Sequence, residues 1–370
     1  MKPVLLHYLA CPMCRAAFRL DVHEKRTVKL SNKEKDYLQA NKKDVSEYES
    51  EVLQGILSCD ACGLAFPIAE GVPRLYKGAD EDYPVKGLPD GATNRMPINK
   101  HEREVQTSFS REWDEHDYDD KTIWTWNLDD RVVTFCEELN IDDPSQIRGK
   151  LMIDAGCGSG ILSMTVSERY QIEIIPIDMS YIIGRAFARN RSNLCHFVQT
   201  SVLRPALKEG IADITYSHGV LHHTYDTKKA FAAVAPLTKK GGIFYVWLYG
   251  KKWGWKRIEF MFHRTMRTII SRLPGYSQTF MVYVMGGLYL VIRFFRRILG
   301  LERIKIKSRS HFWTGIRDKY TPRYAREHTE SEVIGWFREY GYTGVCRRTV
   351  WPKTRIFENS PNLAITGRRE

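Results

Sequence analysis

The sequence predicts an α/β protein with a doubly wound, mainly parallel sheet, preceded by a small metal-binding unit. Two observations predict this fold class. From Leu151 onwards, short apolar strands alternate with helical stretches, and before residue 77 four cysteines occur as two Cys-x-x-Cys pairs. Strands that alternate with helices form a parallel sheet covered on both faces. Cysteine pairs at this spacing are typical of metal ligands rather than disulfides when no secretory context is evident.

Positive charge is concentrated in one segment of the chain. The 370 residues carry a net charge of +12, and residues 251–310 contain fourteen Lys or Arg against two Glu, which accounts for the whole excess. We therefore do not expect a nucleic-acid partner, but we do expect this basic segment to have a local role of its own. The apolar stretch at residues 4–6 is too short for a signal peptide. The expected location is cytoplasmic, with peripheral contact to the inner face of the membrane as an open alternative.

Composition divides the chain into three parts. Residues 1–76 hold both cysteine pairs, residues 77–100 are rich in Gly and Pro and are typical of a linker, and residues 101–370 form the main domain. Residues 251–318 interrupt the main domain as a basic, apolar, helical insertion. Strands are predicted at Leu151–Ala155, 172–177, 196–199, 214–217, 243–248, near 345–350 and at 362–366.

The first unit is predicted to bind zinc. Cys11 and Cys14, and likewise Cys59 and Cys62, each present two thiolates from a tight turn. Four thiolates suit a tetrahedral Zn²⁺ at about 2.3 Å per bond. A unit this small has little core, so the metal is expected to supply much of its folding free energy. Chance pairs or a redox motif are the alternatives.

The residues around these cysteines sharpen the prediction. Cys11-Pro12-x-Cys14 at the start, Cys59 to Gly63 later, and Gly71-Val72-Pro73 at the end together resemble the Trm112-like zinc-ribbon family over residues 1–76. The resemblance implies a structural rather than catalytic metal. Stand-alone members of that family stabilise methyltransferases that use S-adenosylmethionine (SAM), so a fused copy is expected to support the neighbouring domain.

A glycine-rich turn follows the first predicted strand of the main domain. The run is Asp154-Ala155-Gly156-Cys157-Gly158-Ser159-Gly160, and the next strand ends at Asp178-Met179. The glycines permit a sharp turn against which a ligand can lie. A carboxylate at Asp178 can accept both ribose hydroxyls of an adenosyl ligand. Dinucleotide-binding enzymes share the glycine pattern, and Asp178 as a turn residue or helix cap is the plainer alternative.

The order of these pieces, followed by residues 211–223 and by Gly241-Gly242, resembles class I SAM methyltransferases, specifically the methyltransferase type 11 group. The resemblance covers residues 105–250 and 319–370 and implies a Rossmann-like sheet. By it, Asp154 and residues 156–160 face the methionine part of SAM and Asp178 takes the ribose. Ser217 and His218 are implied to lie beside the sulfonium.

Two departures from the family pattern are informative. Where the family often has an acidic residue that contacts the adenine amino group, this chain has Ser201, whose hydroxyl can still accept a hydrogen bond. Enzymes that methylate exocyclic amines or glutamine amides carry Asn/Asp-Pro-Pro-Tyr after the fourth strand, and this chain has 217–220 Ser-His-Gly-Val there. That chemistry is therefore disfavoured.

Candidate catalytic residues are His222 and His223, which end the fourth predicted strand, together with Tyr320 and His328 near the expected pocket mouth. A histidine base can remove a proton from a hydroxyl acceptor. Structural packing of one histidine and solvation of the other is the alternative.

The insertion combines apolar and basic residues. Ile258, Met261, Phe262, Ile269 and Leu273 recur at helical spacing, and residues 280–292 form a thirteen-residue run without a charge. The run is too short to span a bilayer and suits an interfacial segment on an anionic membrane. A helical lid or a homodimer interface are the alternatives.

Together these features predict a SAM-dependent methyltransferase that acts on a small-molecule or lipid-like acceptor, with a structural Zn²⁺. Two alternatives remain: methylation of RNA or of a translation protein, and a non-catalytic SAM-binding protein.

Overall fold

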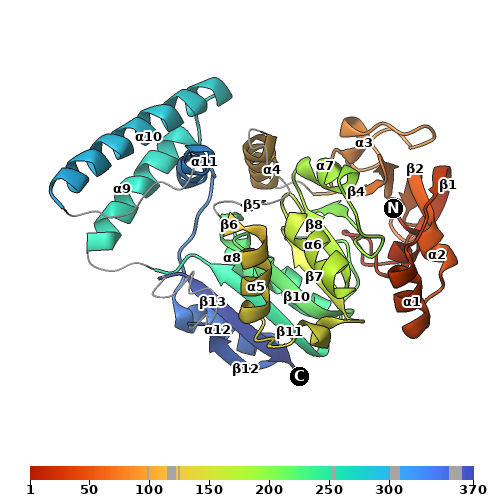
Figure 1. The fold of residues 1–370 in the computed structure, drawn as a ribbon. Coiled ribbons are helices and arrows are strands. Elements are labelled where there is room, and N and C mark those ends of the chain that lie inside the picture. The colour runs from red at the N-terminus through yellow and green to blue at the C-terminus, as the bar shows by residue number, and fades with distance from the viewer. Residues whose placement is uncertain (98–99, 115–121, 124–125, 252–254, 301–308, 350–360) are drawn as a thin grey trace.

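The structure is a computed structural model that describes residues 1–370 except 98–99, 115–121, 124–125, 252–254, 301–308 and 350–360. Within the described residues, eleven strands form one sheet in the order β1-β2-β3-β4-β9-β8-β7-β10-β11-β13-β12 (Figure 1). The ribbon strands β1 to β4 and the main-domain strands therefore belong to a single sheet. The sequence predicted both parts but not their continuity.

The N-terminal unit is an antiparallel meander with helices on one side. Its strands are β1 (Arg19–Thr27), β2 (Ser50–Ser58), β3 (Ala65–Ala69) and β4 (Val72–Leu75). Its helices are the 3₁₀ turn η1 (Pro3–His7), α1 (Asn32–Ala40) and α2 (Ser46–Glu49). The predicted linker contains α3 (Ala79–Asp82) and packs onto the fold, because Ala79, Ala92 and Met96 are buried.

The two units meet where β4 pairs in parallel with β9 (Val198–Thr200). Arg74 and Leu75 lie opposite Gln199 and Thr200. A buried polar cluster supports the same junction. The carboxylate of Glu173 accepts hydrogen bonds from the Tyr48 hydroxyl at 2.8 Å and from Lys43, and His196 contacts it at 2.9 Å. Burial alone would raise the pKa of Glu173, but His196 and Lys43 hold it at about 2.

The main domain has the predicted doubly wound architecture. Parallel strands β9-β8-β7-β10-β11 are followed by an antiparallel return through β13 and β12. Helices cover both faces of this sheet (Figure 1), and an apolar core lies on each side. Its strands are β7 (Leu151–Ala155), β8 (Glu173–Asp178), β10 (Ala212–His218), β11 (Thr238–Leu248), β12 (Tyr342–Arg347) and β13 (Leu363–Arg369).

Six α-helices of the described residues belong to the main domain outside the insertion. They are α4 (Lys100–Asp114), α5 (Leu128–Glu138), α6 (Ile161–Tyr170), α7 (Ile182–Ala188), α8 (Thr227–Val234) and α12 (Glu330–Glu339). The start of α12 shows a capping box, in which Thr329 and Glu332 satisfy each other's backbone N–H. A small two-stranded sheet, β5 (Thr122–Ile123) with β6 (Trp126–Asn127), precedes α5.

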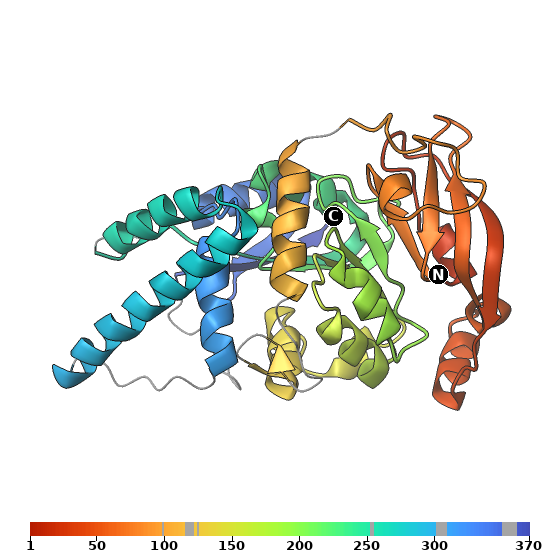
Figure 2. The same cartoon turned by 90° about the horizontal axis from the view of Figure 1, so that it is seen from above.

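In the part of the insertion that the structure describes there are three helices: α9 (Trp255–Ile270), α10 (Gly275–Ile298) and α11 (Arg309–Tyr320). It projects from the main domain on the side away from the ribbon, as both views show (Figures 1 and 2). The predicted thirteen-residue uncharged run lies inside a longer helix, α10, which has 24 residues because Ser277, Gln278 and Thr279 precede the run in the same helix. By length and composition alone, α10 could cross a bilayer.

Candidate active site and zinc site

The glycine-rich turn connects β7 to α6 and has a left-handed backbone that favours glycine. Gly156 has φ +91°, and a Cβ there would lie 2.4 Å from Val220. Gly158 has φ +54°, and a Cβ there would lie 2.3 Å from the Trp113 ring. The turn is therefore shaped both by its backbone conformation and by close neighbours.

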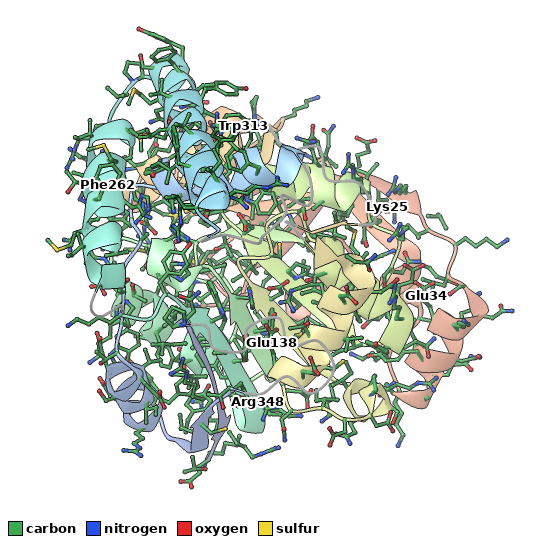
Figure 3. The ribbon with its side chains drawn as sticks, turned by 60° about the vertical axis from the view of Figure 1, so that its left-hand side comes forward. Lys25, Glu34, Glu138, Phe262, Trp313 and Arg348 are labelled. Atoms are coloured by element: carbon green, nitrogen blue, oxygen red, sulfur yellow. The ribbon has the colours of Figure 1, made fainter. Side chains whose placement is uncertain are left out.

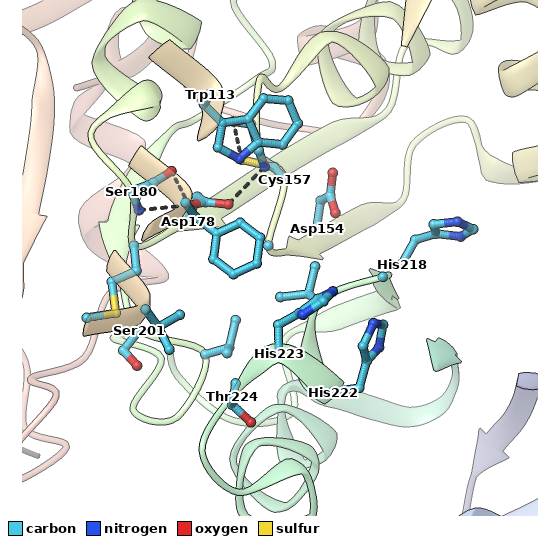
Figure 4. A pocket seen from close by; sticks show the side chains of 18 of the residues that line it. Trp113, Asp154, Cys157, Asp178, Ser180, Ser201, His218, His222, His223 and Thr224 are labelled. Atoms are coloured by element: carbon cyan, nitrogen blue, oxygen red, sulfur yellow. Dashed lines mark hydrogen bonds between the residues drawn. The ribbon is translucent and has the colours of Figure 1, made fainter. Parts of the chain in front are cut away.

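Asp178, at the end of β8, holds this turn. Its Oδ2 accepts a hydrogen bond from the Gly158 N–H at 2.9 Å, and its Oδ1 accepts from the N–H and hydroxyl of Ser180 at 2.8 and 2.6 Å (Figure 4). Each carboxylate oxygen has two lone pairs, so the group retains acceptor capacity for a ligand hydroxyl. The structure thus places Asp178 directly beside the glycine turn.

Asp154 is the buried acid at the base of the site. Its side chain receives a hydrogen bond from the Ser163 hydroxyl, and burial raises its pKa to about 6. It lines the same cavity as Asp178 (Figure 4). A charge at this buried position interacts with neighbouring charges with little screening by water.

A cavity of about 390 Å³ unites most of the predicted SAM residues. A volume of this order suits a small ligand. The predicted residues that line it are Asp154, Gly156, Cys157, Gly158, Asp178, Met179, Ser201, His218, His222 and His223.

Three predicted SAM residues do not line this cavity. Ala155 is fully buried in β7, and the Ser217 hydroxyl donates to the Ala155 carbonyl oxygen at 2.9 Å. Gly160 packs against Phe197, which a Cβ would approach to 2.5 Å. These three residues lie on the side of the turn and of the strand ends that faces away from the cavity. Successive side chains of a strand point to opposite faces of the sheet, so neighbours in the sequence can differ in this way.

Ser201 lines the cavity beside an acidic group that the sequence analysis did not find. Its hydroxyl donates a hydrogen bond to Oε1 of Glu102 at 2.7 Å and accepts one from the Leu203 N–H at 3.2 Å. Glu102 lies on α4, also contacts Arg204, is 6% exposed and lines the cavity. The acidic group at this end of the pocket therefore comes from a helix about a hundred residues earlier. No local pattern in the sequence signals that pairing.

A second group that sequence analysis missed lies beneath the pocket wall. Glu138 is fully buried, pairs with Arg131 at 3.1 Å and accepts a hydrogen bond from the Tyr216 hydroxyl at 2.6 Å. His218 Nδ1 lies 3.1 Å from the other oxygen. Burial would raise the pKa of Glu138, but Arg131 and His218 hold it at about 2. The ionised pair fixes the positions of Arg131 and His218, which both line the cavity.

His222 and His223 lie in the 3₁₀ turn η3 (Leu221–His223) after β10, across the pocket from Asp178 and Ser180 (Figure 4). Both are buried. Among the described residues neither ring nitrogen of His222 has a hydrogen-bond partner. Nδ1 of His223 lies 2.8 Å from the Tyr324 carbonyl oxygen. Burial lowers the pKa of both imidazoles, with His223 adding to the effect at His222.

The structure places Tyr320 and His328 outside the cavity. The Tyr320 hydroxyl bonds to Nδ1 of His263 at 2.7 Å within the insertion. His328 packs edge-on against Trp336, and its Nδ1 lies 3.1 Å from Glu332. Both residues follow the insertion in the sequence, and that position did not predict that their side chains would pack against other parts of the protein and not line the cavity. Their prediction as pocket groups is therefore wrong.

The four cysteines of the ribbon converge as the zinc prediction requires. Their sulfur atoms all lie within 4.8 Å of one another, with Cys11 to Cys62 at 3.6 Å and Cys14 to Cys59 at 3.4 Å. Bonds of about 2.3 Å in a tetrahedron place sulfur atoms about 3.8 Å apart. The four thiolates thus fit a structural Zn²⁺ and leave no ligand position for a substrate.

Comparisons with known proteins agree with both halves of this description. Residues 153–246 match the family model described as a methyltransferase domain, and residues 2–71 match the Trm112p-like protein model. The chain therefore contains a SAM-dependent methyltransferase domain of the class I fold, preceded by a Trm112-like zinc-ribbon domain. SAM and a structural zinc are the cofactors that these domains define.

Individual relatives are distant. An uncharacterized protein of Synechococcus is 29% identical over 256 residues, which is 65% of this chain and 58% of that protein, so the chain spans less than two thirds of its relative's length. A SAM-dependent methyltransferase of Thermotoga maritima is 13% identical with a TM-score of 0.38, covering 72% of this chain and 100% of that one. The complex that contains the Haloferax volcanii Trm112 methyltransferase activator is 13% identical with a TM-score of 0.41, covering 74% and 99%.

Replacing Cys59 by Ser is expected to abolish stoichiometric zinc binding and to lower the melting temperature of the ribbon, because the metal links turns that little core holds together. Elemental analysis of the purified chain should find about one zinc per wild-type chain. Cys346→Ser is the control, because Cys346 is exposed and lies outside the cluster. Full zinc content in Cys59→Ser would contradict the assignment.

Proposed function

We propose that this chain transfers a methyl group from SAM to a lipophilic small-molecule acceptor that binds at the histidine end of the cavity. The observation that carries the proposal is that one cavity joins the glycine turn and Asp178 to a buried wall of aromatic and histidine side chains. When bound, SAM supplies an electrophilic methyl group on a sulfonium. The residues of the chain hold, orient and desolvate the reactants.

The adenosyl end of the proposed SAM site has two carboxylates. Asp178 offers the remaining lone pair of its Oδ2 to a ribose hydroxyl beside the glycine turn. Glu102 offers a carboxylate to the adenine amino group, and Ser201 and Arg204 fix its orientation by their contacts. The guanidinium of Arg204 also lies against this buried carboxylate as its ion-pair partner.

The end of the cavity proposed for the acceptor is lined by aromatic side chains and by buried histidine side chains. The rings of His222 and Tyr249 lie 4.0 Å apart, and Phe109 meets His223 edge-on at 5.3 Å. Trp247 also lines this end. A pocket wall of this kind favours an apolar or planar acceptor and excludes water from the transfer.

His223 is the better-placed base of the two histidines. A carbonyl oxygen only accepts hydrogen bonds, so the contact with Tyr324 requires the proton on Nδ1 of His223. Nε2 is then the unprotonated nitrogen of the neutral ring. Burial lowers the pKa of this ring and keeps it neutral at pH 7. A neutral imidazole with a fixed tautomer can accept a proton from an O–H or N–H acceptor.

Replacing Glu102 by Gln is expected to weaken SAM binding at least about tenfold, because a charged hydrogen-bond acceptor is lost. Isothermal titration calorimetry with SAM measures the change. Glu104→Gln is the matched control on the same helix, since Glu104 pairs with Arg323 at 3.4 Å and does not line the cavity. Equal affinity in the Glu102 variant and the wild type would contradict the proposed adenine contact.

Methyl transfer itself is tested with radiolabelled SAM and three acceptor pools: a cellular lipid extract, a water-soluble metabolite extract, and total RNA with ribosomal protein. We expect label in the lipid extract. Label in RNA or protein alone would support methylation of the translation apparatus instead. SAM binding without label in any pool would favour a non-catalytic SAM-binding protein.

With a labelled acceptor in hand, His223→Gln is expected to lower kcat about a hundredfold or more if the acceptor loses a proton. SAM affinity and melting temperature should stay close to wild type, because glutamine preserves a donor towards Tyr324. His222→Gln is expected to have a smaller effect on kcat, since no contact fixes the tautomer of His222. Unchanged kcat in both variants would rule out a histidine base.

A further inference from the structure

The exposed apolar side chains of this protein are gathered on the insertion. Among the described residues, the exposed large hydrophobic side chains all lie between Ile258 and Leu299, except Met13 and Val22. Soluble monomers rarely expose a contiguous apolar surface of this extent without a partner for it. Only a small core, around Ile270, Val282 and Ile316, holds the three helices together.

These side chains are ordered along the helices. On α10 one stripe repeats at intervals of three and four residues, each member 45–67% exposed: Phe280, Val284, Leu288, Val291, Phe295 and Ile298. Arg293, Arg296 and Arg297 fall on the opposite face by the same spacing. On α9 the predicted apolar face is exposed as well, with Ile258, Met261, Phe262 and Ile269 at 47–59%.

The charged side chains between Phe260 and Gly300 are all positive. Between Phe260 and Gly300 the chain has six arginines and neither Asp nor Glu. A helix with an apolar stripe and a basic opposite face is the type that lies in the headgroup region of an anionic bilayer, with its apolar side in the acyl chains.

We propose that the insertion docks this protein on an anionic membrane surface, with α10 lying in the plane of the interface. A second copy fits less well, because a symmetric contact between two apolar stripes would cover the apolar side chains but give the arginines on the opposite face of α10 no role. A nucleic acid would leave the apolar stripe in water.

A spanning arrangement of α10 conflicts with its packing. Val282, Met285 and Gly286 are buried near the middle of the helix, and a Cβ on Gly286 would lie 2.1 Å from Trp313 of α11. α11 is tied to the main domain in turn. Tyr249 donates to Asp318 at 3.3 Å, and the Ser108 hydroxyl donates to the Thr321 carbonyl oxygen at 3.3 Å. Crossing the bilayer would require α10 to leave these contacts, whereas lying on its surface would not.

Docking would bring the acceptor end of the cavity to the lipid. Asp318 of α11 lines the cavity, and Arg111 of α4 donates to Gln278 of α10 at 3.3 Å. An acceptor dissolved in the membrane would then reach the pocket without crossing water. This last step rests on the proposed function, whereas membrane docking itself does not.

The test is flotation of the full-length chain with vesicles of phosphatidylcholine alone or with about one third phosphatidylglycerol, at low salt, and requires no activity. We expect the chain to float with the anionic vesicles and to sediment away from the neutral ones. The double variant Phe295→Ser/Ile298→Ser should lower the bound fraction at least about tenfold. Arg296→Gln/Arg297→Gln should lower the affinity about fivefold per arginine removed.

Matched controls use the ribbon, on the far side of the molecule from Phe262 (Figure 3). Val22→Ser removes an exposed apolar side chain there, and Lys25→Gln/Lys29→Gln removes two exposed cations. These variants should float like the wild type. Calorimetry with SAM confirms that each variant is folded.

Three results would overturn the proposal. The first is no flotation with either vesicle. The second is a stable dimer in light scattering that the Phe295→Ser/Ile298→Ser variant dissociates. The third is resistance of bound protein to alkaline carbonate extraction, which would indicate a spanning helix. Membrane docking without methyl transfer would uphold this proposal while the proposed function fails.

Discussion

The parallel pairing of β4 with β9 is the interaction on which the remaining structure depends. It places fully buried Arg74 of the ribbon against Gln199, whose side-chain oxygen accepts its hydrogen bond at 2.9 Å. The amide nitrogen of Gln199 then donates to the carbonyl oxygens of Met179 and Ser180 at 3.1 and 3.3 Å. A chain of hydrogen bonds thus runs from the zinc ribbon to the turn that follows Asp178. The ribbon supports the pocket through contacts of its own and not only by adding stability.

This junction also explains the position of Glu102. The strand β9 leads directly into Ser201 and Arg204, which hold the Glu102 carboxylate at the edge of the cavity. Arg15 of the ribbon reaches the same loop, donating to the Pro205 carbonyl oxygen at 2.7 Å. The loop is therefore fixed from the ribbon on one side and from α4 on the other.

Local patterns in the sequence predicted the parts of the site that local geometry determines. Gly156 and Gly158 are needed for a turn within five residues, and Cys11 and Cys14 share one turn, so spacing alone identified them. Glu102 and the Arg131–Glu138 pair are set by tertiary packing, and residues so far apart carry no common spacing. Tyr320 and His328 failed as pocket residues for the same reason, since position along the chain does not determine the direction of a side chain.

The insertion shows a second limit of periodicity. The spacing of Ile258, Met261 and Phe262 predicted an apolar helix face, but an apolar face by itself does not say what covers it. In the structure the helix buries a different side, with Phe260 and Ile270 inward, and leaves the predicted face exposed.

The two ends of the cavity are lined by different parts of the chain. Strand ends of the sheet and Glu102 of α4 line one end, whereas Asp318 of the insertion lines the other end, where Tyr324 of the following segment contacts His223. Residues more than two hundred positions apart in the chain therefore meet in one cavity.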